Sequence, residues 1–289
     1  MDPRAWRRFR RNKGALVGAA LVAVITLTGV LGPLLAPHDP AEQFRETLVD
    51  DNGLPERPGT VAGHPLGGDG PLGRDELSRL LHGATVSMAV AYLATGLALL
   101  IGVGIGLLSG YFKGWLDLST MRFVDLVLSM PFLLIAIVLQ KVWVVEGTVA
   151  PLMVLCVILG GLSWTTLARV TRAKTMEASS QEYVQAARAL GVSHARILVR
   201  HILPNIAGPI IALATLMVAR MIIAESALSF LGLGVRPPTA SWGSMLSESE
   251  SLKIAAPHLL LLPATLIATA VFGFNLFGEG LRDAFDPKE

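Results

Sequence analysis

The sequence is poor in charged residues. Asp, Glu, Lys and Arg make up 16% of its 289 residues, and 52% of the residues are hydrophobic. Soluble globular domains carry about a quarter charged residues. A soluble all-helical protein is disfavoured, because long uncharged runs leave no polar face to turn toward water. The composition therefore indicates a protein that spans a membrane.

Cysteine is also scarce, since the chain has only Cys156. That residue lies inside an apolar run, which argues against a disulfide framework and a cysteine metal site. No stretch reads G-x-x-x-x-G-K-[ST], so the chain itself is not expected to bind ATP through a P-loop. No histidine is spaced with a Ser, Cys or Glu as a buried nucleophile or metal site requires. We therefore expect neither an enzyme active site nor a metal site here.

Six long apolar runs are present. A helix that crosses a bilayer needs about 20 mostly apolar residues, and each run is free or nearly free of charge. The sequence therefore predicts an all-α membrane protein with six transmembrane helices. The predicted spans are Ala15–Ala36, Ala84–Phe112, Arg122–Gln140, Gly147–Ala168, Ile206–Phe230 and Ile254–Phe277.

The charges predict the topology. Residues 1–13 hold six basic residues against Asp2 alone, residues 37–75 hold eight acidic against three basic residues, and residues 169–200 are basic again. Basic segments next to spans stay in the cytoplasm. Both termini and the 169–205 segment are therefore expected inside, and residues 37–75 outside. A cleaved signal peptide is disfavoured because the first apolar run is long.

The chain is expected to have two parts. Residues 1–83 would form an N-terminal cytoplasmic arm, the first transmembrane helix and an extracytoplasmic loop. Residues 84–289 would form a five-helix core with a cytoplasmic loop at about 172–205. Within the second span, Gly102, Gly106 and Gly110 recur every four residues on one face, which favours close helix packing.

Ionisable residues in or near the spans are candidates for the lining of a pathway. Arg122 and Asp125 stand three residues apart and could pair with each other. Glu225 lies in the outer half of the fifth span, where a structural role beside an arginine is the alternative. Arg220 also lies in this span, but it does not share a face with Glu225. Pro131 is expected to kink the third span.

The basic stretch 182–205 predicts a helix, a tight turn and a second helix. Gly191 can take the left-handed conformation that ends many helices. Ser193 can then cap a second helix that runs until Pro204. The stretch could lie on lipid headgroups as an amphipathic helix. A docking element for a cytoplasmic protein is favoured, because the fixed turn and the pair Ala186 and Ala187 suit close contact with a partner.

This stretch resembles the EAA loop of ABC-importer permeases. The matching residues are Gln185-Ala186-Ala187, Gly191 and Leu203-Pro204, with Gln185 in place of the family's glutamate and His201 in place of its isoleucine. Further stretches resemble the C-type permeases for dipeptides and oligopeptides, in order and over nearly the whole chain. They are HPLGGDGPLGRDELSRLL, GYFKGW, EYVQAARALG, RHILPN, ALSFLGLGVRPPTASWG and FNLFGEGLRDAFDP.

The resemblance implies a MetI-like permease core in the bacterial inner membrane, which forms half of a translocation pathway for peptides. Its partners would be a second homologous permease, two cytoplasmic ATPases that bind ATP and Mg, an extracytoplasmic binding protein and membrane lipid, but no nucleic acid. ATPase-coupling residues would be Glu182, Tyr183, Gln185, Ala186, Ala187, Arg188, Leu190, Gly191, Ser193, Leu203 and Pro204. Candidates for binding-protein docking are Asp69, Arg74, Asp75, Arg236 and Trp242.

Alternatives remain open at this point. The same machinery imports nickel complexes or glutathione in similar permeases. A transporter driven by an ion gradient belongs to another class, and it would require mid-span carboxylates or broken helices at matched places in two halves. A membrane-embedded enzyme would require a buried catalytic pair.

Overall fold

The computed structural model describes residues 3–143, 145–147 and 149–285, and these residues form helices and loops without a β-strand. The helices are α1 (Pro3–Arg11), α2 (Lys13–Leu35), α3 (Arg45–Leu48), α4 (Glu76–Phe112), α5 (Gly114–Ser129), α6 (Phe132–Val142), α7 (Val149–Ser179), α8 (Glu182–Ala189), α9 (His194–Arg196), the π-helical turn η1 (Ile197–Ile202), α10 (Leu203–Phe230), α11 (Trp242–Ser249), the 3₁₀ turn η2 (Glu250–Leu252) and α12 (Pro257–Phe285).

Five helical segments are long and apolar enough to cross a membrane. They are α2, α4, α7, the continuous segment His194–Phe230 and α12. The pair α5 and α6 makes a sixth span if it is counted as one. The predicted all-α membrane fold is confirmed. The predicted ends differ at α7, which continues to Ser179 instead of ending at Ala168, and at the fifth span, which begins at His194 instead of Ile206.

The predicted third span is broken rather than kinked. α5 ends at Ser129, α6 begins at Phe132, and the two helices are bent by 86°. Pro131 has no backbone N–H, and a proline drives the residue before it out of the helical region. Met130 accordingly takes an extended conformation with φ −84° and ψ 137°. Residues 130–131 therefore form a corner.

The centre of the bundle is the contact between α4 and α7. A Cβ added at Gly106 would lie 2.6 Å from the carbonyl oxygen of Ala168, and one added at Gly110 would lie 2.6 Å from that of Arg172. Gly102 meets the preceding turn of α7 in the same way, with the Trp164 carbonyl oxygen 2.7 Å from its added Cβ. These three glycines thus let the two backbones approach at successive turns.

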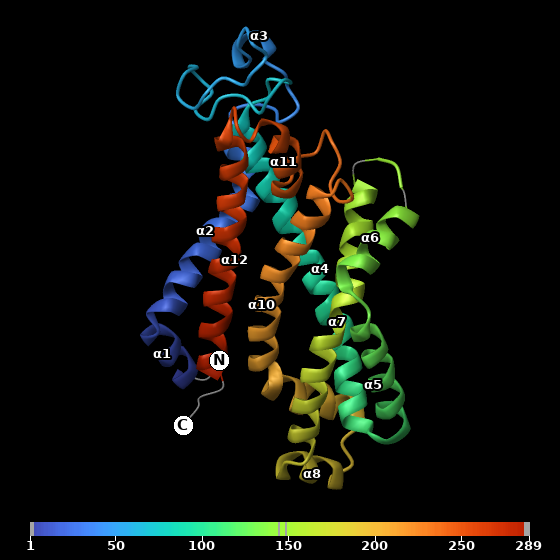
Figure 1. Ribbon diagram of the computed structural model, residues 1–289. Helices are drawn as coiled ribbons and strands as arrows, with labels where there is room; N and C mark the ends of the chain where they lie inside the picture. Colours follow the sequence, from blue (N-terminus) through green and yellow to red (C-terminus); the bar gives the residue numbers. More distant parts are fainter. Residues whose placement is uncertain (1–2, 144, 148, 286–289) are drawn as a thin grey trace.

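The other long helices pack around this centre. α2 lies on α12 and α4 through small residues, because a Cβ at Gly18 would be 2.4 Å from the Phe277 nitrogen and one at Gly32 would be 2.4 Å from the Leu81 carbonyl oxygen. α10 packs against both α12 and α4. Figure 1 shows α5 and α6 on one side of the bundle, against α7.

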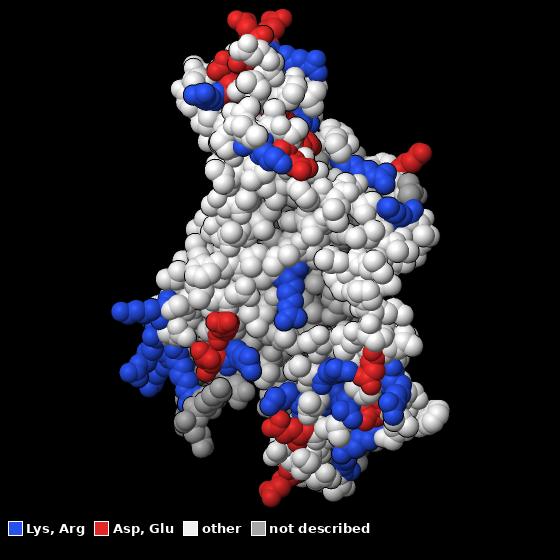
Figure 2. All heavy atoms as spheres, viewed as in Figure 1, with Lys and Arg blue, Asp and Glu red and all other residues white. Residues whose placement is uncertain are grey.

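The bundle has two distinct ends (Figure 1). The α8 end carries α1, α8 and the last turns of α12. The α11 end carries α3, α11 and the loop segment 36–75. Figure 2 shows acidic and basic side chains gathered at both ends, with a mostly uncharged surface between them. This distribution is the one expected for a protein whose middle lies in lipid.

Candidate functional site

The turn between α8 and α9 is built as the sequence predicts. Gly191 has φ +73°, a conformation that costs side-chain-bearing residues about 1–2 kcal/mol. Its N–H bonds to the Arg188 carbonyl oxygen at 3.0 Å, and the Val192 N–H bonds to that of Ala187 at 3.1 Å. These two bonds form a Schellman motif, which ends α8 in a defined geometry.

The second helix differs from the prediction at both ends. Ser193 occupies the N-cap position of α9, but its side chain makes no capping hydrogen bond. Pro204 does not stop the helix, because the π-helical turn before it runs directly into α10. In that turn the Leu203 N–H bonds to the Leu198 carbonyl oxygen, five residues back. The wider turn lets the chain pass a residue that has no N–H to donate.

The end of α4 holds this segment in place. The Arg188 guanidinium lies 4.6 Å from the centre of the Tyr111 ring, which is a favourable position for a cation–π contact. The Tyr111 hydroxyl shares a hydrogen bond of 2.8 Å with Nδ1 of His194. Val184 and Ile197 are fully buried beneath the turn. Both helices are thus anchored to the bundle.

The outer face of the segment stays uncovered. Leu190 is 82% exposed. The side chains of Glu182, Tyr183, Gln185, Ala186, Arg188, Ser193 and Pro204 are also exposed, whereas Ala187 is buried and Leu203 is half-buried. The turn therefore presents an exposed leucine among basic and small residues on a rigid backbone.

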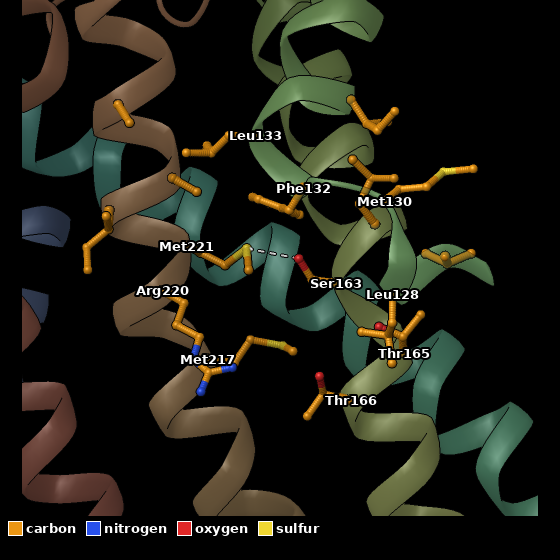
Figure 3. A pocket seen from close by; sticks show the side chains of 16 residues that line it. Leu128, Met130, Phe132, Leu133, Ser163, Thr165, Thr166, Met217, Arg220 and Met221 are labelled. Atoms are coloured by element: carbon orange, nitrogen blue, oxygen red, sulfur yellow. Dashed lines mark hydrogen bonds between the residues drawn. The ribbon is translucent and has the colours of Figure 1, made fainter. Parts of the chain in front are cut away.

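A cavity of about 400 Å³ opens between three segments of the bundle. The corner of α5 and α6, the middle of α7 and the middle of α10 line it, as Figure 3 shows. Its walls are largely apolar, with Met130, Phe132, Met217 and Met221 among them, and Arg220 supplies a charge. The volume lies in the range of about 300–1,000 Å³ that is usual for small-molecule sites.

The predicted pathway candidates lie elsewhere. Asp125 forms an exposed ion pair with Arg169 of α7, which corrects the expected pairing of Arg122 with Asp125. Glu225 is fully buried, accepts hydrogen bonds from Ser87 at 3.0 Å and Ser229 at 2.7 Å, and so ties α10 to α4. None of Arg122, Asp125 and Glu225 lines the cavity.

At the α11 end, most of the predicted docking residues are internal. Trp242 is fully buried, and its Nε1 donates to the Leu80 carbonyl oxygen at 3.2 Å. It cannot meet a binding protein, because it fills the space between α11 and α4. Asp75 is also fully buried. Arg236 is exposed, which a docking residue requires.

Asp69 and Arg74 belong to a cluster of four charged residues, which we call the ion cluster: Asp69, Arg74, Arg79 and Glu248. Both arginines contact both carboxylates. Arg79 Nη2 lies 2.8 Å from Glu248 Oε2, and Arg79 Nε lies 3.2 Å from Asp69 Oδ2. The charges balance within the cluster, so these residues fix the outer loop onto α4 and α11.

Two histidines and a carboxylate meet beside this cluster, which histidine spacing alone did not reveal. Ligand atoms of His38, His64 and Asp75 lie within 4.8 Å of one another. Asp75 already uses both oxygens, because Oδ1 bonds to His64 Nδ1 at 2.9 Å and Oδ2 accepts from the Ser78 N–H at 2.8 Å. The group therefore caps the start of α4, and we assign no metal to it.

Membrane-length helices around an apolar cavity, with an exposed rigid turn at one end, define a multi-pass membrane protein. The chain belongs to the family of binding-protein-dependent transport system inner membrane components, whose model matches residues 102–289. Residues 4–52 match the N-terminal TM domain of oligopeptide transport permease C. The predicted membership of the ABC-importer permeases is confirmed.

Curated relatives match almost the whole chain. The dipeptide transport system permease protein DppC of Haemophilus influenzae is 36% identical over 98% of this chain and 93% of its own length. The di/tripeptide transport system permease protein DppC of Pseudomonas aeruginosa is 37% identical over 98% of this chain and 91% of its own length. The glutathione transport system permease protein GsiD of Escherichia coli is 38% identical over 98% of this chain and 89% of its own length.

A solved structure shares the fold. A chain of the MetNI methionine ABC transporter, in inward-facing conformations, matches with a TM-score of 0.56 and 16% identity. The match covers 71% of this chain and 95% of that one. The MetI-like architecture predicted from the sequence is therefore confirmed.

Proposed function

We propose that this chain forms one half of the translocation pathway of an importer for short peptides. In this proposal the turn at Gly191 transmits the motion of a cytoplasmic ATPase to the bundle. The observation that supports this proposal is that the turn is connected directly to α7 and α10. α8 follows α7 after a two-residue break, and α9 continues into α10 through η1. α7 and α10 are two of the walls of the cavity.

A displacement of the turn would therefore move two cavity walls together. The Schellman motif and the contacts with Tyr111 make the turn rigid, so it would move as a body rather than deform. The cavity would then open to one side of the membrane or the other. ATP must bind one of these two states more tightly, or its binding would not shift the equilibrium.

The partners follow the same scheme. Two cytoplasmic ATPases would bind ATP and Mg and contact the exposed residues around Leu190 and Gly191. A second homologous permease would supply the other half of the pathway, and an extracytoplasmic protein would deliver the solute to the α11 end near Arg236. The basic residues of α1 support a cytoplasmic location for the α8 end.

In the proposed division, residues 1–83 hold the arm, the first span and the outer loop, and residues 84–289 hold the transport core. The names of the relatives support a peptide as the solute, since two carry di- or tripeptides and the third carries glutathione, itself a tripeptide. Dipeptides are our first choice, and glutathione is the alternative.

Gly191→Pro tests the coupling role. Proline fixes φ near −65° and donates no N–H, so it cannot form the turn. Gly53→Pro is a matched control at the opposite end, because Gly53 has φ +75° and its N–H also bonds to a carbonyl oxygen, that of Asp50. We expect both variants to insert normally, while only Gly191→Pro abolishes uptake of labelled dipeptide. Normal uptake by Gly191→Pro would refute the role.

A further inference from the structure

Arg220 has an unusual position. It is the only residue with a formal charge among those that line the cavity in the described part of the chain. It lies near the middle of α10, far from both charged ends of the bundle. Figure 3 shows its side chain leaving α10 toward the space that faces Thr166 of α7.

No carboxylate of the described residues lies within ion-pair distance of Arg220. Arg172 of α7, by contrast, has an acidic partner in Asp117. Glu225 is on the same helix, but its oxygens bond to Ser87 and Ser229. Arg220 therefore contributes a cation to the cavity that the described chain does not neutralise.

Such a cation is expensive at this depth. An arginine at the centre of a bilayer costs several kcal/mol unless it faces a polar cavity or meets an anion. Its planar guanidinium matches a carboxylate, which it can bind through two parallel hydrogen bonds. A position in a transport cavity thus suits transient binding of a carboxylate.

The remaining walls suit the rest of a small peptide. Met130, Met217 and Met221 offer flexible apolar side chains that adapt to ligands of varied shape. Three residues with hydroxyl groups also line the cavity: Ser163, Thr165 and Thr166. The Ser163 hydroxyl donates to the sulfur of Met221 at 3.9 Å. A fixed cation beside adaptable apolar walls would select a carboxylate and tolerate different side chains.

We infer that Arg220 forms a subsite of the pathway that binds the terminal carboxylate of the transported peptide. This inference rests on the proposed function, and it adds a chemical requirement inside the membrane to any selection made by the binding protein. The rival occupant is an acidic residue of the second permease, which would make Arg220 a structural contact between subunits.

The test uses cells that lack the native copy of this chain and carry the rest of the importer. They receive the wild-type chain, Arg220→Gln, Arg220→Lys or the control Arg282→Gln, whose arginine is exposed near the end of α12. Uptake of labelled alanyl-alanine is compared with that of its C-terminal amide, at a concentration where the wild type takes up both. The assembled complex is quantified by copurification.

We expect Arg220→Gln to lower alanyl-alanine uptake about tenfold or more, because a charge-assisted bidentate contact is lost. Arg220→Lys should restore part of the rate, and uptake of the amide should change less than twofold. The control should match the wild type for both compounds, and complex yield should be equal throughout.

Three results would overturn the subsite. Arg220→Gln could leave alanyl-alanine uptake unchanged, it could lower uptake of both compounds equally, or it could lower the yield of complex, as an ion pair with the second permease requires. The proposed function fails separately, if cells with no copy of this chain take up alanyl-alanine as fast as cells with the wild type.

Discussion

Two regions at opposite ends of the molecule, the ion cluster and the turn at Gly191, treat their charged and apolar side chains in opposite ways. At the α11 end, the ion cluster pairs its own charges, and Trp242 is buried against α4. At the α8 end, Leu190 is 82% exposed. Among the ion pairs and aromatic contacts of the described residues, Arg188 takes part only in the contact with the Tyr111 ring. The ion cluster is completed by the chain itself, whereas the turn at Gly191 presents a rigid surface for a partner.

Both ends are nevertheless preorganised. Ordering loops on binding costs free energy, so a surface that is already rigid can bind more tightly. The ion cluster fixes the outer loop, and the Schellman motif fixes the turn. The ion cluster already has its partners within the chain, whereas the turn leaves Leu190 uncovered. Mutations in the ion cluster should therefore lower stability, and a mutation at Leu190 should lower uptake.

The largest expected effect is at the closed end. Arg79 is almost fully buried between two carboxylates, so Arg79→Met would leave Asp69 and Glu248 with Arg74 alone and a net negative charge in the cluster. Breaking a buried ion pair in this way costs about 3–5 kcal/mol of unfolding free energy. A thermal unfolding scan in detergent should show a much lower midpoint. Arg236→Met, at an exposed arginine of the same end, should shift stability by no more than about 0.5 kcal/mol.

A second effect lies between the ends, where α4 meets α7. Gly106→Ala would place a methyl group 2.6 Å from the Ala168 carbonyl oxygen, whereas the same change at Gly104 meets no atom within 4 Å. Overpacking of this kind costs about 1–3 kcal/mol. The unfolding midpoint should fall for Gly106→Ala and stay level or rise for Gly104→Ala. Equal midpoints would show that the helices can separate at no cost.

At the open end, Tyr111 should control order rather than global stability. Tyr111→Leu removes the cation–π contact with Arg188 and the hydrogen bond to His194, which together contribute about 1–2 kcal/mol. Amide hydrogen exchange in α8 and α9 should accelerate, while exchange in α4 stays slow. Tyr111→Phe keeps the ring and loses only the hydroxyl, so it should give an intermediate rate.

The smallest stability effect is expected at Leu190. Leu190→Ala should change the unfolding free energy by no more than about 0.5 kcal/mol, because the side chain is exposed. Dipeptide uptake should still fall several-fold, since the contact with the ATPase is lost. Leu34→Ala is the matched control, because Leu34 of α2 is equally exposed at 82% and should retain uptake. The comparison of the two ends fails if both variants transport alike.

The sequence predicts the spans well because hydropathy depends only on composition along the chain. It also predicts the turn at Gly191, since φ +73° is a conformation that favours glycine strongly. It does not predict that the helix continues past Pro204, because the π-helical turn η1 accommodates a residue that has no N–H to donate. The break at Pro131 exceeds the expected kink for the opposite reason, since here the chain leaves the helix entirely.

The cavity could not be predicted from the sequence. Its walls come from α5, α6, α7 and α10, and nothing in the sequence shows that Phe132, Thr166 and Arg220 face one another. The burial of Trp242 and Asp75 could not be predicted from the sequence either, because their sequence neighbours are those of exposed loop residues. Arg220 carries a signal that could have been used, since it is a charged residue in a predicted span.

The most direct test of the coupling account is photo-crosslinking in native membranes. A benzophenone amino acid would replace Leu190, and for comparison Leu34, and mass spectrometry would identify the adducts. We predict that position 190 crosslinks to a P-loop ATPase, with a yield that changes when ATP is added, and that position 34 does not. Adducts of position 190 with lipid alone, in cells that import dipeptide normally, would contradict the account.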